Sequence, residues 1–129
     1  LATSLSQRLI RRICPHCAVK RKFTAQEKSI MNKLVEKYGD TLDFTDKFTY
    51  DTKGCKECNY TGYLNRIAVF EILEVTEPIR ELISAGASSL KVREQAIQDG
   101  YRPLLVDALQ KVVDGYVTLE EVNKKLVLF

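Results

Sequence analysis

Two pairs of cysteines, each pair with two residues between its members, constrain this chain more than any other feature. Cys14 and Cys17 form the first pair, and Cys55 and Cys58 form the second, with 37 residues between the pairs. Two intervening residues let both thiolates face one ion while neighbouring backbone N–H groups turn toward the sulfurs. Two such pairs complete a closed, tetrahedral four-sulfur shell, which is an arrangement of structural zinc. The sequence therefore predicts one structural zinc ion held by all four cysteines.

Other chemistry can use the same cysteines. Two disulfides would require an oxidising compartment, and nothing in the given sequence suggests export. Iron could occupy the four thiolates instead, as in a rubredoxin-like site, whereas redox catalysis by one pair would leave the other pair unexplained. His16, the only histidine, is expected to face solvent rather than to replace a cysteine ligand. A catalytic zinc ion with a bound water is therefore not expected, while iron and disulfides remain alternatives.

Composition and charge limit the class of protein. A chain of 129 residues with 45% hydrophobic residues fits one domain, or one domain with a small appendage, and has no apolar run as long as the roughly 18 residues of a membrane span. We expect a cytosolic protein, and a piece of a longer one. The segment 8–22 has no acidic residue but has six basic ones: Arg8, Arg11, Arg12, Lys20, Arg21 and Lys22. Such a cluster is either a contact surface for phosphate, lipid headgroups or an acidic partner, or an ordinary solvated face.

Local patterns predict helices and strands in the first half of the chain. Leu5, Leu9, Ile10 and Ile13 recur at helical spacing, which predicts the tail of an amphipathic helix before the first cysteine pair. Thr24 and Glu27 form a capping-box pattern, so a helix is expected from there to Gly39. Residues 66–75 are rich in β-branched and aromatic side chains and predict a strand, and a shorter strand is expected near 48–50.

The second half of the chain is predicted to be helical. Helix starts are expected at Thr76, at Ser88 or Ser89, at Pro103, and at Thr118, where Glu121 would complete a second capping box. The predicted fold class is α+β and mostly helical, with a tetracysteine zinc-binding part that contains a short β-hairpin or small sheet and is packed on a C-terminal helical bundle. The predicted parts are 1–13, the end of a helix; 14–75, the tetracysteine zinc-binding part; and 76–129, the C-terminal helical part.

The sequence lacks the common signatures of catalysis. It has no G-x-x-x-x-G-K-[ST] phosphate loop, no G-x-G-x-x-G segment, and, with a single histidine, no Ser/His/Asp set. The adjacent Glu120 and Glu121 stand at a predicted helix start, where the helix dipole explains them better than acid–base chemistry does. This segment by itself is therefore not expected to be an enzyme.

Several motifs resemble those of one family, in order and over nearly the whole chain. Residues 7–17, QRLIRRICPHC, resemble the QRLVRxLCPxC segment of the bacterial type II secretion and type IV pilus assembly ATPases (the GspE/PilB type). Further along, 54–63 is similar to their GCxxCxxTGY segment, Arg66 falls on the arginine that follows, and 68–71 falls on GIFE. Two later segments, 82–87 and 115–122, match LI..GA and G.TT.EEV. Asn65 replaces the usual glycine before the arginine, and asparagine tolerates the left-handed backbone that this turn needs.

The resemblance implies a hexameric, magnesium-dependent ATPase at the cytoplasmic face of the inner membrane, which drives assembly of a pilus or pseudopilus. The phosphate loop of that family lies upstream of these motifs, so this chain resembles a C-terminal domain that carries the zinc site, and 1–13 would leave the ATPase core. ATP and Mg would belong only to the full-length parent. Expected partners are the other subunits of a homohexamer and inner-membrane platform or secretion and pilus components. Candidate contacts to the nucleotide or to a partner are Arg8, Arg11, Arg12 and Arg66.

Two other functions fit parts of the sequence. A zinc-ribbon module could bind nucleic acid through the basic cluster at 8–22, although only Phe23 interleaves with that cluster and stacking platforms need more aromatic residues. The same cluster could instead meet anionic lipid, which leaves peripheral membrane association open. The sequence does not distinguish secretion, pilus assembly and DNA uptake.

Overall fold

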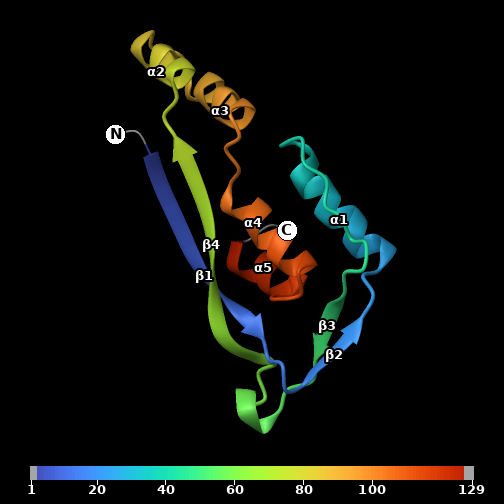
Figure 1. Ribbon diagram of the computed structural model, residues 1–129. Helices are drawn as coiled ribbons and strands as arrows, with labels where there is room; N and C mark the ends of the chain where they lie inside the picture. The colour runs from blue at the N-terminus through green and yellow to red at the C-terminus, as the bar shows by residue number, and fades with distance from the viewer. Residues whose placement is uncertain (1–2, 127–129) are drawn as a thin grey trace.

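A long two-stranded ribbon organises the fold. The computed structural model describes residues 3–126. Strands β1 (Thr3–Ile13) and β4 (Tyr63–Glu74) pair antiparallel along their length, and most of the remaining elements lie on one side of this ribbon (Figure 1). On the covered face, Ile10 and Val69 are fully buried. On the opposite face, Leu5 and Ile72 lie directly across from each other and are both more than half exposed.

The predicted helix over 1–13 is wrong, because the described part of this range is strand β1. A register shift between Arg11 and Ile13 breaks the alternation of the strand. Ile10 and Ile13 are therefore both buried although they are three residues apart, a spacing that imitates one face of a helix. Leu5 and Leu9 are four residues apart, and this even spacing puts them on one face of a strand as readily as on one face of a helix.

The segment between the cysteine pairs adds a helix and a second small sheet. Strands β2 (Ala18–Arg21) and β3 (Thr49–Thr52) pair antiparallel. Between them, α1 (Ala25–Glu36) begins at Thr24 with both halves of the predicted capping box formed. The predictions of this helix and of strands near 48–50 and 66–75 are confirmed.

The four C-terminal helices form two separate pairs. Helices α2 (Glu77–Ser84) and α3 (Ser89–Gln98) lie together beyond the end of β4, whereas α4 (Leu104–Val113) and α5 (Leu119–Leu126) lie against the ribbon (Figure 1). Thr76 and Ser88 cap α2 and α3 as predicted, because their hydroxyl groups accept backbone N–H groups of the first turn. The α+β fold class is thus confirmed.

One hydrophobic core joins residues from all three predicted parts of the chain. Ile10 of β1, Met31 of α1 and Leu109 of α4 are fully buried in the same apolar cluster. The boundaries at 13 and 75 remain a prediction, and residues 1–2 and 127–129 of the predicted terminal parts lie outside the described residues. Within 3–126, no helix has the length and apolar character needed to cross a membrane.

Candidate metal centre

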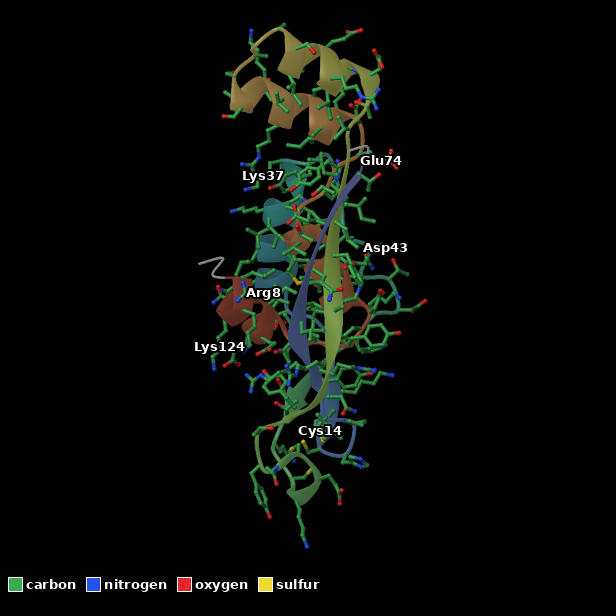
Figure 2. All side chains as sticks on the ribbon, turned by 90° about the vertical axis from the view of Figure 1, so that its left-hand side faces the viewer. Arg8, Cys14, Lys37, Asp43, Glu74 and Lys124 are labelled. Atoms are coloured by element: carbon green, nitrogen blue, oxygen red, sulfur yellow. The ribbon has the colours of Figure 1, made fainter. Side chains whose placement is uncertain are left out.

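Cys14 lies at the end of the ribbon that is farthest from α2 and α3 (Figure 2), and the other three cysteines gather around it. Cys14 and Cys17 occupy the turn between β1 and β2. Cys55 and Cys58 follow β3, and Cys58 ends a single 3₁₀ turn, η1 (Lys56–Cys58). Each pair therefore stands where a strand of one sheet ends and a strand of the other begins, so the two sheets place the pairs opposite each other.

The sulfur atoms are spaced as one metal ion requires. The four Sγ atoms all lie within 4.8 Å of one another. The Cys14–Cys55, Cys17–Cys58 and Cys55–Cys58 sulfur separations are 3.8, 3.9 and 3.7 Å. A tetrahedral ion with Zn–S bonds of about 2.3 Å gives an S–S edge of roughly 3.8 Å. The four predicted ligands could thus hold one metal ion, and the donor set fits zinc.

Backbone N–H groups turn toward one of these sulfurs. The N–H of Gly62 donates to Cys58 Sγ at 3.2 Å, and the N–H of Cys55 donates to the same sulfur at 3.3 Å. Gly62 has a φ of +83°, and a Cβ on it would lie 2.5 Å from Thr52 Oγ1. Only glycine can bring this N–H to the sulfur without displacing β3.

The thiols differ in how readily they ionise. Burial by itself would raise the pKa of Cys58. The hydrogen bonds from the N–H groups of Cys55 and Gly62 have a larger effect and lower this pKa to about 6. Burial raises the pKa of Cys55 to about 11 and also raises the pKa of Cys17. One sulfur is therefore ready to bind a cation at neutral pH, and a metal ion must displace protons from the others.

His16 does not join the metal-binding group. Its side chain is exposed, and among residues 3–126 the group of clustered metal-ligating side chains consists of the four cysteines. A group of this kind closes its coordination shell with protein sulfur, which is the property of structural rather than catalytic sites.

Arg11, predicted to contact a nucleotide or a partner, has its charge paired inside the molecule. Its backbone N–H donates to Glu121 Oε2 at 2.9 Å, and its guanidinium donates to Glu121 Oε1 at 2.8 and 3.1 Å. The predicted capping box at Thr118 is therefore half formed. Thr118 Oγ1 accepts the N–H of Glu121 at 3.1 Å, but the Glu121 carboxylate turns to β1 instead. The sequence analysis missed this role of Glu121, and no local signal could have revealed a partner 110 residues away.

The other three candidate arginines remain at the surface. The guanidinium of Arg12 lies over the ring of Tyr116, at 5.1 Å from its centre, and Arg8 is exposed midway along β1. Arg66 is exposed on β4 directly across from Arg11, and both line one surface hollow with Tyr63. Asn65 has a φ of +65°, which confirms the left-handed turn expected there.

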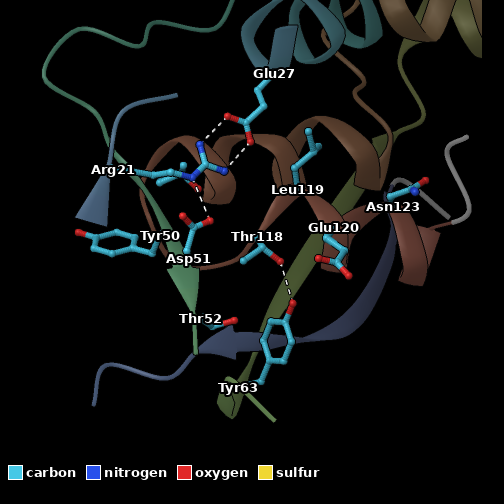
Figure 3. Close-up of a pocket in the computed structure, with 11 residues that line it drawn as sticks. Arg21, Glu27, Tyr50, Asp51, Thr52, Tyr63, Thr118, Leu119, Glu120 and Asn123 are labelled. Atoms are coloured by element: carbon cyan, nitrogen blue, oxygen red, sulfur yellow. Dashed lines mark hydrogen bonds and ion pairs between the residues drawn. The ribbon is translucent and has the colours of Figure 1, made fainter. Parts of the chain in front are cut away.

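Arg21, another member of the basic cluster, lines a polar pocket of about 460 Å³. Arg21 lies in its wall between Glu27, which accepts two hydrogen bonds at 2.8 and 2.9 Å, and Asp51, at 3.0 Å (Figure 3). On the opposite side, Tyr63 and Thr118 share a hydrogen bond of 3.0 Å between their hydroxyl groups. Arg21 is thus neutralised within the fold, as Arg11 is.

Comparison with known proteins gives a consistent result. The model of the family described as "Type II/IV secretion system protein" matches residues 1–124. The protein named "Type IV pilus assembly ATPase PilB" is 36% identical in Myxococcus xanthus, over 92% of this chain and 20% of the relative. The protein of the same name from Thermus thermophilus is 38% identical, over 95% of this chain and 13% of the relative. The "Type II secretion system protein E" of Aeromonas hydrophila is 33% identical, over 95% of this chain and 23% of the relative. The chain thus spans less than a quarter of the length of these relatives.

Proposed function

The chain belongs to the type II/IV secretion system protein family, and on that basis we propose that it is the C-terminal part of a motor ATPase for pilus or pseudopilus assembly. Its relatives include proteins named as pilus assembly ATPases and a type II secretion protein. The segment itself has no phosphate loop. ATP and Mg would bind upstream in the parent, which we propose acts as a hexamer at the cytoplasmic face of the inner membrane.

Within that motor, we propose that the four cysteines hold one structural zinc ion. The observation that carries this proposal is the convergence of four sulfurs from two distant pairs, at separations close to the edge of a zinc–thiolate tetrahedron. The ion would join the end of β1 to the start of β4, because the cysteine pairs flank these strands. The ribbon would then move as one rigid body and pass movement of the motor core to a partner.

The exposed surface of the ribbon supports an attachment to the upstream core. Leu5, Leu9, Phe70 and Ile72 lie on its uncovered face and are each at least 40% exposed. An apolar face of this kind is normally covered in the intact protein. Arg8, Arg12 and Arg66 have no carboxylate partner in the contacts of the described residues, and they remain candidates for contact with the nucleotide or a neighbouring subunit. We assign Arg11 a structural role.

The alternative of a nucleic-acid-binding ribbon loses support from the side-chain contacts. Arg11 and Arg21 are neutralised by carboxylates, and Lys20 lies over the ring of Phe48, at 4.1 Å from its centre. Phe23 is buried and offers no stacking surface. A salt-dependent shift of labelled DNA or RNA by micromolar protein would restore this alternative, and vesicle co-sedimentation tests the lipid alternative in the same way.

The proposed function is tested on the full-length parent. Its ATPase rate and its pilus or pseudopilus assembly are measured with intact protein, after zinc is removed by a chelator that is then itself removed and replaced by magnesium, and after zinc is restored. We expect chelation to reduce the assembly-coupled ATPase rate and zinc to recover it. An ATPase rate that is unchanged by loss of the metal would contradict the proposed mechanical role.

A further inference from the structure

Helices α2 and α3 form a unit with its own small apolar interior. Ile79 of α2 and Ala96 of α3 are buried, yet the hydrophobic core of the molecule contains no described residue of either helix. Among the helices and strands of the described chain, each of these two packs extensively only on the other. Figures 1 and 2 show the pair projecting beyond the end of β4.

Two short segments connect this pair to the rest of the molecule, and they are tied together at its base. Thr76, before α2, donates its hydroxyl to Asp99 Oδ2, after α3, at 2.7 Å. Gly100 follows with a φ of +101° and no atom within 4 Å of the position where a Cβ would stand. A pocket of about 280 Å³, lined by Ile72 and Gly100 among others, separates the end of β4 from the end of α3. The base of the pair is thus not packed tightly against the ribbon.

Arg102 bridges the helix pair and the rest of the molecule. Its Nη1 donates to the carbonyl oxygen of Ile97 in α3 at 3.0 Å, and its Nε donates to Asp40 Oδ2, just after α1, at 2.6 Å. The hydroxyl of the adjacent Tyr101 donates to Glu71 of β4. Burial and this bond raise the pKa of Tyr101 to about 12, so the phenol remains a donor at neutral pH. Polar contacts, rather than apolar packing, therefore fix the direction of the pair.

We propose that α2 and α3 form a hinged arm that turns as one unit about Gly100. We also propose that the guanidinium of Arg102, held between Asp40 and the carbonyl oxygen of Ile97, is a latch that holds the arm in the observed position. The arm keeps its internal contacts in every position, because Ile79, Ala96 and the Thr76–Asp99 bond all lie on the arm side of the hinge. The latch can open because its two side chains are each about a third exposed, and ion pairs with this exposure are weak. The arm would give the rigid ribbon a movable end that meets a partner.

Electron spin resonance distances between the arm and α1 test the latch. Spin labels are carried by non-natural residues at Leu90 and Lys33, both exposed, so that the cysteines stay free for metal. We compare the original protein with the variant Asp40→Ala and with a control variant, Glu36→Ala. Glu36 is a suitable control because it is an exposed carboxylate at the end of α1. We expect Asp40→Ala to increase the population at other distances about fivefold and the control to leave the distribution unchanged. Identical distributions in all three proteins would overturn the latch.

Amide hydrogen exchange in the same proteins tests whether the arm moves as a unit. In Asp40→Ala, we expect faster exchange at 99–103 and unchanged protection inside α2 and α3, because the contacts within the arm remain. Loss of protection throughout both helices would show that the arm unfolds instead of turning, and it would overturn the proposal of a rigid arm.

Discussion

Arg11 and Glu121 join strand β1 to helix α5 through three hydrogen bonds. The side chain of Glu121 is fully buried, whereas that of Arg11 is 34% exposed and lies over the ring of Tyr63. The carboxylate also accepts the backbone N–H of Arg11, so it binds both the main chain and a side chain of β1. This contact holds α5 against the ribbon.

We predict that Arg11→Met lowers the free energy of unfolding by about 3 kcal/mol, because it leaves a buried carboxylate without a charged partner. The matched control is Lys47→Met. It removes the cation of an exposed pair with Asp114 and is expected to lower the free energy of unfolding by less than about 1 kcal/mol. Urea denaturation of the metal-loaded protein measures both values. Equal losses in the two variants would show that the Arg11–Glu121 contact stabilises the protein no more than the exposed Lys47–Asp114 pair does.

The free energy of unfolding depends on pH partly through the carboxylate of Glu27. The hydrogen bonds from Arg21, opposed by burial and assisted by the N–H of Thr24, lower the pKa of Glu27 to about 2 from its ordinary 4.5. The carboxylate of Glu27 therefore takes up a proton at a lower pH in the folded state than in the unfolded state. The stabilisation by this carboxylate is fully present above about pH 4.5 and is lost as the pH falls from there toward 2.

We predict that Glu27→Gln is less stable than the original protein by about 1 kcal/mol at about pH 6, and that the difference narrows as the pH falls toward about 3. Glutamine keeps the capping box but removes the charge that Arg21 meets. Denaturation curves of both metal-loaded proteins provide the comparison, from about pH 6 down to the lowest pH at which both still hold the metal. A difference that stays constant or widens in acid would contradict this assignment.

A side chain at Gly62 is predicted to be costly, because Gly62 donates its N–H to Cys58 Sγ. Gly62→Ala combines a positive φ with a contact of 2.5 Å to Thr52 Oγ1, so we expect a loss of about 2–4 kcal/mol and weaker metal binding. Gly39→Ala is the control, since Gly39 has a similar φ of +77° but no atom within 4 Å of the added Cβ; it should lose only about 1 kcal/mol. The readouts are thermal denaturation and competition for zinc with a chromogenic chelator. If both variants bind zinc equally well, the Gly62 N–H does not support the site.

Local signals predicted local structure well in this chain. The capping box of Thr24 and Glu27 and the caps at Thr76 and Ser88 lie where the sequence indicated, because a cap depends on side chains within one turn of the helix. The four cysteines were found by their spacing, and the structure brings them together.

Long-range contacts and strand irregularities could not be predicted from the sequence. The register shift after Arg11 let β1 imitate a helix, and a shift of this kind is visible only once the partner strand is known. Glu121 was assigned to a local cap, but a distant backbone N–H and guanidinium together offer it a stronger set of donors. The separation of α2 and α3 from α4 and α5 likewise depends on packing, which the spacing of apolar residues does not specify.

The most direct test of the account is the metal content of protein produced with zinc and iron both available, with reactive thiols counted before and after chelation. We expect one zinc ion per chain, no reactive thiol before chelation, and four reactive thiols together with loss of the fold afterwards. One iron per chain would keep the four-sulfur site but contradict zinc. A folded protein without metal, with its thiols freely reactive or oxidised, would contradict the central claim that Cys14, Cys17, Cys55 and Cys58 hold one structural ion.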